Sequence, residues 1–385
     1  MAELMKIPAI RFKGFSGEWH KNKVGDLCDC IVPGRNKPKA FDGDIPWITT
    51  PDITNNGIIG KSKEGLAISR EEAKKVGAKI VPKDSIIMSC VGELGIVAMV
   101  KNELIVNQQL HAFIPKEKLS NWFLLYGLSI RKEYMEEVAT KTAVPYMNKD
   151  NCNSIPIIYP TLPEQTQIGR YFQNLDKLIS LHQAKVNKLV NLKKAMLEKM
   201  FPKVGADVPK IRFKGFVGAW EEKDLGQLAK ITTGSSNRED SGLDGEYTFF
   251  DRSDDIRTSN IYLFDCEAVI VAGEGSDFVP KYFVGKFDLH QRTYAIVNFD
   301  KLVGKFLYYY IYLFRKHFLD YAVGSTVKSL RLPMFKEMPV KYPTEPEQQK
   351  IGAYFQNLDS LITLHQQELN KLNNLKKACL AKMFV

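Results

Sequence analysis

Apolar residues recur at alternating three- and four-residue steps in two segments of the chain, residues 160–202 and 343–385. The spacing continues over about four heptads in each segment without an internal proline or glycine after the first turns, which is typical of coiled-coil helices. We call these positions the seam. In the first segment the seam comprises Phe172, Leu175, Ile179, His182, Val186 and Leu189. In the second it comprises Phe355, Leu358, Ile362, His365, Leu369 and Leu372.

The two segments are near-copies of each other. Roughly 30 of about 43 aligned positions match, which indicates an internal repeat. A second repeat opens each half of the chain, with IPAIRFKGFSGEW from Ile7 and VPKIRFKGFVGAW from Val208. The stretches between these copies, residues 20–159 and 221–342, resemble each other far less. Two constant frames around two dissimilar inserts predict a protein that presents two different surfaces at a fixed separation.

A helix with a single apolar stripe must bury that stripe, and its own duplicate is the nearest partner. Both a parallel and an antiparallel pair fit the pattern. We expect an antiparallel coiled coil, which would place one insert at each end about a pseudo-twofold axis. His182 and His365 interrupt the seam at equivalent places. We interpret them as a polar layer that sets the register, rather than as a metal-binding or pH-sensitive pair.

Each predicted helix begins with the same motif. Thr161 with Glu164, and Thr344 with Glu347, fit a capping box in which the threonine caps an N–H group and the glutamate reaches back. Two lysines lie on the seam near the C-terminal ends, where the helix dipole favours a cation. They are Lys193 and Lys376.

The inserts mix strands and helices, so the fold class we expect is α+β, with two mixed α/β domains joined by the paired helices. Strand-like runs cover residues 45–49, 85–89, 96–100, 268–272 and 294–297, and helix-like runs cover 69–76, 121–139 and 304–322. The predicted division is a first domain over 1–159, a central long helix over 160–207, a second domain over 208–342 and a C-terminal long helix over 343–385.

Composition favours one class of partner and argues against others. A formal net charge of +10 favours a polyanionic partner. The six cysteines form no C-x-x-C pair, so we expect free thiols in the cytoplasm and no metal site. The N-terminus lacks a secretory signal, and the most apolar window, Phe306 to Phe314, has about a third of the length of a membrane span, so no membrane partner is expected.

At this point the chain resembles the specificity subunit of type I restriction–modification systems. The resemblance rests on the order insert–helix–insert–helix and on P-x-x-PEQ-x-x-IG followed by a helix ending in NLKKAxL. It also rests on IPWITTPDI at Ile45–Ile53, on Gly92–Gly95 leading to NQQLHAFIP at Asn107–Pro115, and on the run Ala272–Ile296. YTFFDRSDDI at Tyr247–Ile256 is only a loose counterpart of IPWITTPDI, so the strand order of the second domain is less secure.

The resemblance implies a non-catalytic, DNA-binding subunit. Each insert would be a target recognition domain that reads one half of a split double-stranded DNA sequence. The helices would set the spacing and bind two modification (methyltransferase) subunits, and two restriction subunits would join outside. S-adenosylmethionine, ATP and Mg²⁺ are then expected on the partner subunits, with no cofactor in this chain.

Candidate DNA contacts lie mainly in basic, turn-rich loops, because arginine suits guanine O6 and N7, asparagine suits adenine, and lysine suits phosphate. For each candidate the alternative is a solvated turn or a surface ion pair. The polar clusters at Gln108–His111 and His290–Arg292 fit either a core hydrogen-bond network or DNA contact. The candidates are Arg35, Asn36, Lys37, Lys39, Thr49, Thr50, Lys141, Thr142, Ser235, Ser236, Asn237, Arg238, Arg292, Ser325, Thr326, Lys328 and Arg331.

Rival interpretations explain less of the chain. Asp52 followed by Glu72 and Lys74 mimics a metal-dependent nuclease pattern, but we place Glu72 and Lys74 on an exposed helix, and the second half has no equivalent. The run ending in Lys61-Ser62 superficially resembles a phosphate loop, yet Asn55 stands where its first glycine is required. A pure coiled-coil scaffold would not explain two large mixed domains or the basic charge.

Overall fold

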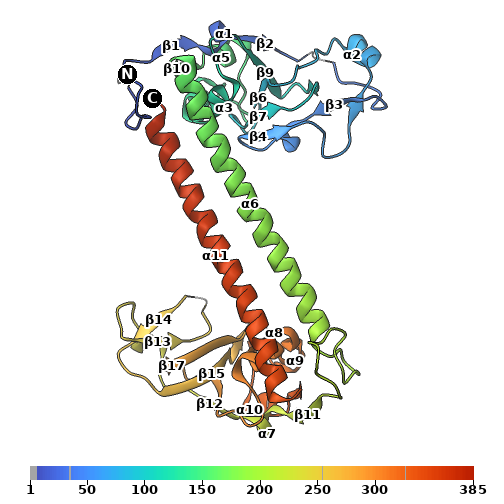
Figure 1. Ribbon diagram of the computed structural model, residues 1–385, viewed down its shortest axis with the longest axis vertical. Helices are drawn as coiled ribbons and strands as arrows, with labels where there is room; N and C mark the ends of the chain where they lie inside the picture. Colours follow the sequence, from blue (N-terminus) through green and yellow to red (C-terminus); the bar gives the residue numbers. More distant parts are fainter. Residues whose placement is uncertain (1–6, 34–35, 254, 326) are drawn as a thin grey trace. The chain divides into compact units, whose positions relative to one another are not determined.

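The chain forms two compact units. The computed structural model describes residues 7–33, 36–253, 255–325 and 327–385. Unit 1 contains the chain up to His182 together with Glu368–Val385, and unit 2 contains Gln183–Gln367. The two long helices, α6 (Leu162–Met200) and α11 (Glu345–Met383), are each divided between the units (Figure 1).

Unit 1 is built around three sheets, with strand orders β2-β9-β6-β7-β4, β5-β3-β8 and β1-β10. The strands are β1 (His20–Lys23), β2 (Cys28–Ile31), β3 (Ile45–Ile48), β4 (Gly57–Ile59), β5 (Ala67–Ile68), β6 (Ile86–Ser89), β7 (Val97–Val100), β8 (Ile105–Val106), β9 (Leu110–Pro115) and β10 (Pro156–Tyr159). The helices are α1 (Val24–Leu27), α2 (Arg70–Val76), α3 (Asn121–Ser129), α4 (Lys132–Val138) and α5 (Lys149–Asn153), with a 3₁₀ turn η1 (Thr50–Asp52).

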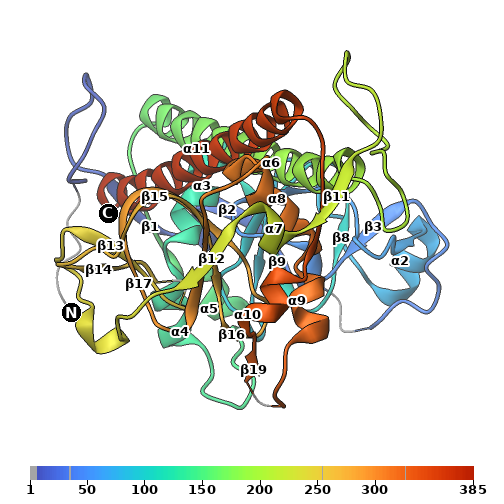
Figure 2. The same cartoon turned by 90° about the horizontal axis from the view of Figure 1, so that it is seen from below.

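Unit 2 carries one larger sheet, ordered β12-β18-β15-β17-β13-β14, and the pairs β11-β20 and β16-β19. Figure 2 labels β12, β15, β17, β13 and β14 of the larger sheet. The strands are β11 (Glu221–Asp224), β12 (Lys230–Thr233), β13 (Tyr247–Phe250), β14 (Arg257–Ser259), β15 (Phe264–Ala272), β16 (Glu274–Gly275), β17 (Lys281–Leu289), β18 (Thr293–Val297), β19 (Lys328–Ser329) and β20 (Pro339–Tyr342). The helices are α7 (Leu225–Leu228), α8 (Gly304–Phe314), α9 (Lys316–Tyr321) and α10 (Leu332–Lys336), with a 3₁₀ turn η2 (Arg238–Asp240).

The predicted strands are present, but two predicted helices are broken in two. The run 121–139 forms α3 and α4, and the run 304–322 forms α8 and α9. Residues 123–128 are all buried, whereas α4 buries only Met135, so the two helices differ in how deeply they are packed. The side chain of Arg315, at the second break, donates a hydrogen bond of 2.6 Å to the carbonyl of Tyr312 at the end of α8.

Each unit contains an antiparallel helix pair, the orientation that we expected of the two that fit the seam. In unit 1 the start of α6 packs against the end of α11, where the Phe172 and Phe384 rings lie 5.8 Å apart. In unit 2 the end of α6 packs against the start of α11, where the Phe201 and Phe355 rings lie 6.0 Å apart. Phe172, Leu175, Val186, Phe355, Leu358 and Leu369 are buried, and Ile179, His182, Leu189, Ile362, His365 and Leu372 are half-buried.

The seam lysines bind aspartates on the opposite helix. Lys376 lies 2.5 Å from Asp176 in unit 1, and Lys193 lies 2.5 Å from Asp359 in unit 2. The same carboxylates accept hydrogen bonds from buried tyrosines at equivalent positions, Tyr126 and Tyr309. These lysines are therefore ion-pair partners across the helix pair, in addition to any contribution from the helix dipole.

The expected capping boxes are wrong. Glu164 does not reach back along its own helix, because both of its carboxylate oxygens accept hydrogen bonds of 2.7 Å from Arg11. Glu347 is bound in the same way by Arg212. The arginine of each opening repeat thus ties that repeat to the start of a long helix. None of the helices formed by the described residues combines the length and apolar character that a membrane crossing requires.

Candidate nucleic-acid interface

In unit 2 two parallel strands end side by side and deliver five polar residues to one place. Phe250 of β13 pairs with Leu289 of β17, and the N–H of His290 donates to the Phe250 carbonyl at 2.9 Å. Each strand then gives way to polar residues. We call residues 251–252 and 290–292 the unit 2 tip.

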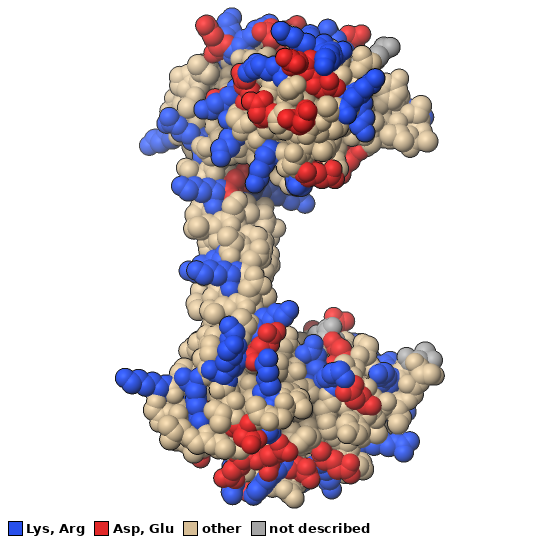
Figure 3. Space-filling model, turned by 90° about the vertical axis from the view of Figure 1, so that its right-hand side faces the viewer, with Lys and Arg blue, Asp and Glu red and all other residues tan. Residues whose placement is uncertain are grey.

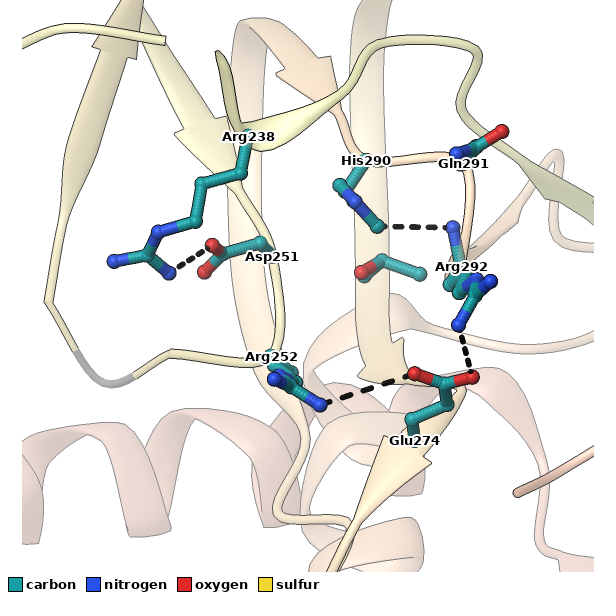
Figure 4. Close-up of a pocket in the computed structure, with 8 residues that line it drawn as sticks. Arg238, Asp251, Arg252, Glu274, His290, Gln291 and Arg292 are labelled. Atoms are coloured by element: carbon teal, nitrogen blue, oxygen red, sulfur yellow. Dashed lines mark hydrogen bonds and ion pairs between the residues drawn. The ribbon is translucent and has the colours of Figure 1, made fainter. Parts of the chain in front are cut away.

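The tip surrounds a hollow of about 390 Å³ lined by three arginines and two carboxylates. Arg238 lies 2.6 Å from Asp251, Arg292 lies 2.8 Å from Glu274, and Arg252 lies 3.9 Å from the other oxygen of Glu274 (Figure 4). Asp251 is buried, whereas the side chains of Arg252 and Arg292 are each 63% exposed. Exposed guanidinium groups can exchange such a carboxylate for a phosphate or the edge of a guanine.

The loop before β19 extends this surface. Gly275 pairs with Lys328, which places the loop beside Glu274. A second hollow is lined by Arg238, Arg252, Ser253, Gly275, Ser276, Ser325, Val327 and Lys328. Four of the predicted contacts therefore lie around one continuous surface: Arg238, Arg292, Ser325 and Lys328.

His290 borders the same hollow. Burial lowers the pKa of its imidazole below the ordinary value, and nearby Asp251 opposes this only in part. At neutral pH the ring is therefore uncharged; its Nδ1 atom accepts from the Arg292 backbone N–H at 3.1 Å, which leaves the Nε2–H group as a donor.

Unit 1 has the same arrangement. Ile48 of β3 pairs in parallel with Val106 of β8, and the N–H of Asn107 donates to the Ile48 carbonyl at 2.9 Å. We call residues 49–50 and 107–109 the unit 1 tip. Within it, the Thr50 hydroxyl donates to the Gln109 side chain at 3.2 Å, and Gln108 donates to the backbone carbonyl of Asn36 at 3.2 Å.

Backbone hydrogen bonds show that the two tips are equivalent. Cys90 donates to the Gln109 carbonyl and Gly273 to the Arg292 carbonyl, both at 2.8 Å. Gln108 reaches the loop after β2, and Gln291 reaches the corresponding loop after β12, where it donates to Asn237 at 2.6 Å. Tyr247–Arg252 is thus a true counterpart of Ile45–Thr50, and the shared parallel pairing resolves the strand order of the second domain.

The two tips share the same backbone pairing, but their side chains differ. The unit 1 tip carries only neutral hydroxyl and amide groups, at Thr49, Thr50 and Asn107–Gln109. The unit 2 tip carries charged groups, at Asp251, Arg252 and Arg292. Sequence comparison missed Asp251, Arg252 and Glu274, although the alignment of Asp251-Arg252 with Thr49-Thr50 was the signal that could have found them.

Several predicted contacts stand elsewhere. Ser236 must be withdrawn, because its hydroxyl is buried and donates to the buried Asp288 at 2.7 Å. Arg35 and Thr326 lie outside the described residues. Thr49 and Thr50 belong to the unit 1 tip, and Asn36 and Asn237 accept hydrogen bonds from tip glutamines. The remaining candidates are exposed and line neither hollow; they are Lys37, Lys39, Lys141, Thr142, Ser235 and Arg331.

The nuclease-like residues have structural roles. The Asp52 carboxylate accepts bonds from the backbone N–H groups of Thr49 and Lys63 and from the Thr49 hydroxyl, at 2.6–2.8 Å. Burial raises its pKa, but these bonds outweigh burial and lower the pKa overall. Glu72, which we expected to be exposed, is buried and accepts from the Lys39 N–H at 2.7 Å. Neither carboxylate is placed for metal-dependent hydrolysis.

On one face of the molecule the described basic side chains do not form a separate patch. On the face shown in Figure 3, Lys and Arg side chains are interspersed with Asp and Glu over the surface of each unit. The local chemistry of the tips is therefore more informative about a polyanionic partner than the net charge.

Comparison with known proteins gives one consistent result. The family model described as "Type I restriction modification DNA specificity domain" matches residues 16–191 and 218–374. The MjaIX specificity subunit of a type I restriction enzyme from Methanocaldococcus jannaschii is 25% identical over 411 residues, covering 95% of this chain and 92% of that protein. The EcoDI specificity subunit from Escherichia coli is 33% identical over 143 residues, or 37% of this chain and 31% of that protein.

Solved structures show the same fold. The S subunit of a type I restriction–modification system from M. genitalium matches with a TM-score of 0.69 and 15% identity, covering 98% of this chain and 99% of that one. The two matched segments of the family model correspond to the two inserts with their adjoining helices, and each contains one of the tips. The chain therefore belongs to the family of type I restriction–modification DNA specificity proteins.

Proposed function

We propose that this chain is the DNA-recognition subunit of a type I restriction–modification complex, and that each unit reads one half of a split DNA target. It has no catalytic role of its own. The observation that carries the proposal is the pair of equivalent tips: one backbone frame presents two different sets of hydrogen-bonding groups. Two units that recognised the same DNA sequence would carry the same side chains at their tips, whereas recognition of two different half-sites requires different side chains.

The side chains suggest what each tip reads. Amide groups such as those of Gln108 and Gln109 pair with the N6 and N7 edge of adenine, and threonine methyl groups contact thymine. Arginines such as Arg292 pair with guanine O6 and N7, and carboxylates accept from cytosine N4. We therefore propose A·T contacts for the unit 1 tip and at least one G·C contact for the unit 2 tip. Lys328 and the loop cations would hold the DNA backbone.

The long helices would dock the modification subunits. Each unit exposes two leucines on a long helix at equivalent positions, Leu178 and Leu181 in unit 1 and Leu361 and Leu364 in unit 2. Equivalent apolar surfaces fit two identical partners. We propose two adenine-methyltransferase subunits there and two restriction subunits beyond them. S-adenosylmethionine, ATP and Mg²⁺ would belong to those partners, and the complex would act on DNA in the cytoplasm.

The helix length would set the gap between the half-sites. A helix of 39 residues is about 58 Å long at about 1.5 Å per residue. At about 3.4 Å per base pair this length matches roughly 17 base pairs from end to end.

The test is to express the chain with its methyltransferase partner and to map methylated adenines across the host genome. A motif made of two short sequences separated by an unread gap is the expected result. A continuous palindrome would contradict the proposal. A catalytically inactive methyltransferase partner serves as the control, because it must abolish all of the added methylation.

A further inference from the structure

Three soft ligands meet in the interior of unit 1. They come from distant parts of the chain: Cys90 directly follows β6, His111 lies on β9 and Cys152 lies on α5. One ligand atom from each lies within 4.8 Å of the other two. The Nδ1 atom of His111 is 3.2 Å from the Cys90 sulfur. All three side chains are buried, with His111 the most exposed at 4%.

Part of the cluster lacks a hydrogen-bond partner in the described chain, although the Cys90 thiol donates to the Gln109 carbonyl at 3.1 Å. The Nε2 atom of His111 is buried and has no hydrogen-bond partner among the described residues. The Cys152 thiol has only a contact of 3.8 Å with the Met147 carbonyl in addition to the cluster.

Unit 2 shows that the fold does not require these residues. The positions equivalent to Cys90, His111 and Cys152 hold Gly273, Tyr294 and Phe335. The Tyr294 and Phe335 rings lie 4.3 Å apart and fill the space. A Cβ atom at Gly273 would lie 2.9 Å from the Tyr294 ring and 2.5 Å from the Arg292 carbonyl oxygen. Two aromatic rings are thus sufficient to fill this position in unit 2. Packing alone therefore does not explain why unit 1 has two cysteines and a histidine there.

We propose that Cys90, His111 and Cys152 bind a zinc ion. In a tetrahedral site, with Zn–S near 2.3 Å and Zn–N near 2.0 Å, neighbouring ligand atoms are separated by about 3.5–3.8 Å. The His111 Nδ1–Cys90 Sγ distance of 3.2 Å is slightly shorter than this range, and no separation in the cluster exceeds 4.8 Å, so small side-chain shifts would close the site. A water molecule or a backbone carbonyl would take the fourth position.

Charge balance also favours the ion. Two thiols would release their protons to solvent on binding, and two thiolates with one Zn²⁺ form a neutral group suited to a buried place. The earlier expectation of no metal site rested on the absence of a C-x-x-C pair. That motif joins ligands that are close in sequence, whereas the fold brings Cys90, His111 and Cys152 together from three separate elements.

The site would brace the segments that carry the unit 1 tip. Cys90 accepts a backbone hydrogen bond from Met147 and donates one to Gln109 of the tip, both at 2.8 Å. His111 follows Gln109 by two residues on the same strand. A bound ion would therefore link β6, β9 and α5 directly beneath the tip. Zinc binding does not rest on the proposed function, and DNA is not needed to test it.

The first experiment measures metal in the full chain, purified without chelators from cells grown with zinc. Elemental analysis should find about one zinc per chain. After removal of the metal, added Co²⁺ should produce the intense thiolate-to-cobalt absorption of a cysteine site. A chain that contains no zinc and yields no such absorption overturns the proposal. So does a Cys90–Cys152 disulfide in the metal-free chain freshly purified under thiol-free conditions.

Variants assign the site to these residues. Cys90→Ser and Cys152→Ser should each lose the bound zinc and the cobalt absorption, whereas Cys266→Ser in unit 2 should retain both. The triple variant Cys90→Gly/His111→Tyr/Cys152→Phe copies the filling of unit 2. It should fold, as judged by circular dichroism and a cooperative melt, and bind no metal. Full zinc binding by the triple variant would place the ion elsewhere and refute the assignment.

Discussion

Arg292 and Gln109 occupy the same place in the two units, because the carbonyl of each accepts a hydrogen bond of 2.8 Å from the residue that follows a central strand. The backbone position is shared and the side chain is not. A guanidinium group and a carboxamide differ in charge and in the number of donors, so they suit different base edges. At the scale of single residues, the difference between the units is therefore a difference in what they can read.

Replacing Arg292 should affect one half-site only. Arg292→Ala removes a guanidinium that is 63% exposed, and loss of a bidentate base contact costs about 1–3 kcal/mol. Binding of the intact target by the methyltransferase complex should weaken roughly 5- to 150-fold, as measured by fluorescence anisotropy. Lys316→Ala, which removes an exposed cation of the same unit, is the control. Equal loss of recognition at both half-sites in methylation mapping would contradict this assignment.

Asp52 should make stability dependent on pH. Its pKa in the folded state lies below the ordinary value of 3.8, so its contribution is present above that value and is lost as the pH falls through the folded-state pKa. Asp52→Asn should lower the free energy of unfolding by about 1–3 kcal/mol at pH 7, measured by urea denaturation. The gap between variant and native chain should narrow below about pH 4. Asp44→Asn, at an exposed position, should show neither effect, and a gap that does not vary with pH would count against the explanation.

The opening repeats and the long helices form one structural element in each unit. Arg11 donates to Glu164 and also to the carbonyls of Ser16 and Gly17, so a single guanidinium closes its own loop and ties it to α6. Arg212 does the same for Glu347 in unit 2. Both glutamate side chains are only 1% exposed. In each unit the opening repeat binds the start of a long helix through this ion pair. The need to keep this contact explains part of the similarity between the two copies of each repeat.

Breaking either ion pair should destabilise its own unit. Arg11→Ala leaves the Glu164 carboxylate buried and uncompensated, which costs about 3–5 kcal/mol. Arg212→Ala should cost a similar amount in unit 2. Hydrogen exchange followed by mass spectrometry would show which unit loses protection. Lys13→Ala and Lys214→Ala, at exposed positions of the same repeats, are the matched controls, and effects no larger than theirs would show that the buried pair is dispensable.

The chain contains two units with the same arrangement of elements. Unit 1 includes the C-terminal end of α11, and unit 2 includes the C-terminal end of α6. The contacts recur in detail, with Lys376 on Asp176 in unit 1 and Lys193 on Asp359 in unit 2. Selection for a shared frame explains this constancy, because both helix pairs must bury the same seam. The inserts are free to diverge where only the bound DNA constrains them.

Lengthening both helices should lengthen the gap in the target. One extra heptad in α6 and in α11, inserted in their central parts, preserves the apolar seam. It adds about 10.5 Å to each helix, or roughly 3 base pairs of DNA. Methylation mapping should then show unchanged half-sites with a wider gap. An unchanged gap would refute the role of the helices in spacing, and a heptad added to one helix alone should impair assembly.

The sequence by itself determined the duplicated plan, the two long helices and most strands, because the repeats and the period of apolar residues are local signals. Tertiary structure decided the rest. Glu164 and Glu347, expected to cap their own helices, instead bind Arg11 and Arg212. An uncompensated buried carboxylate costs more free energy than an uncapped helix end. Asp251, Arg252 and Glu274 meet only because β13 pairs with β17 and β16 with β19. Cys90, His111 and Cys152 likewise meet through packing alone, so no spacing along the chain could reveal them.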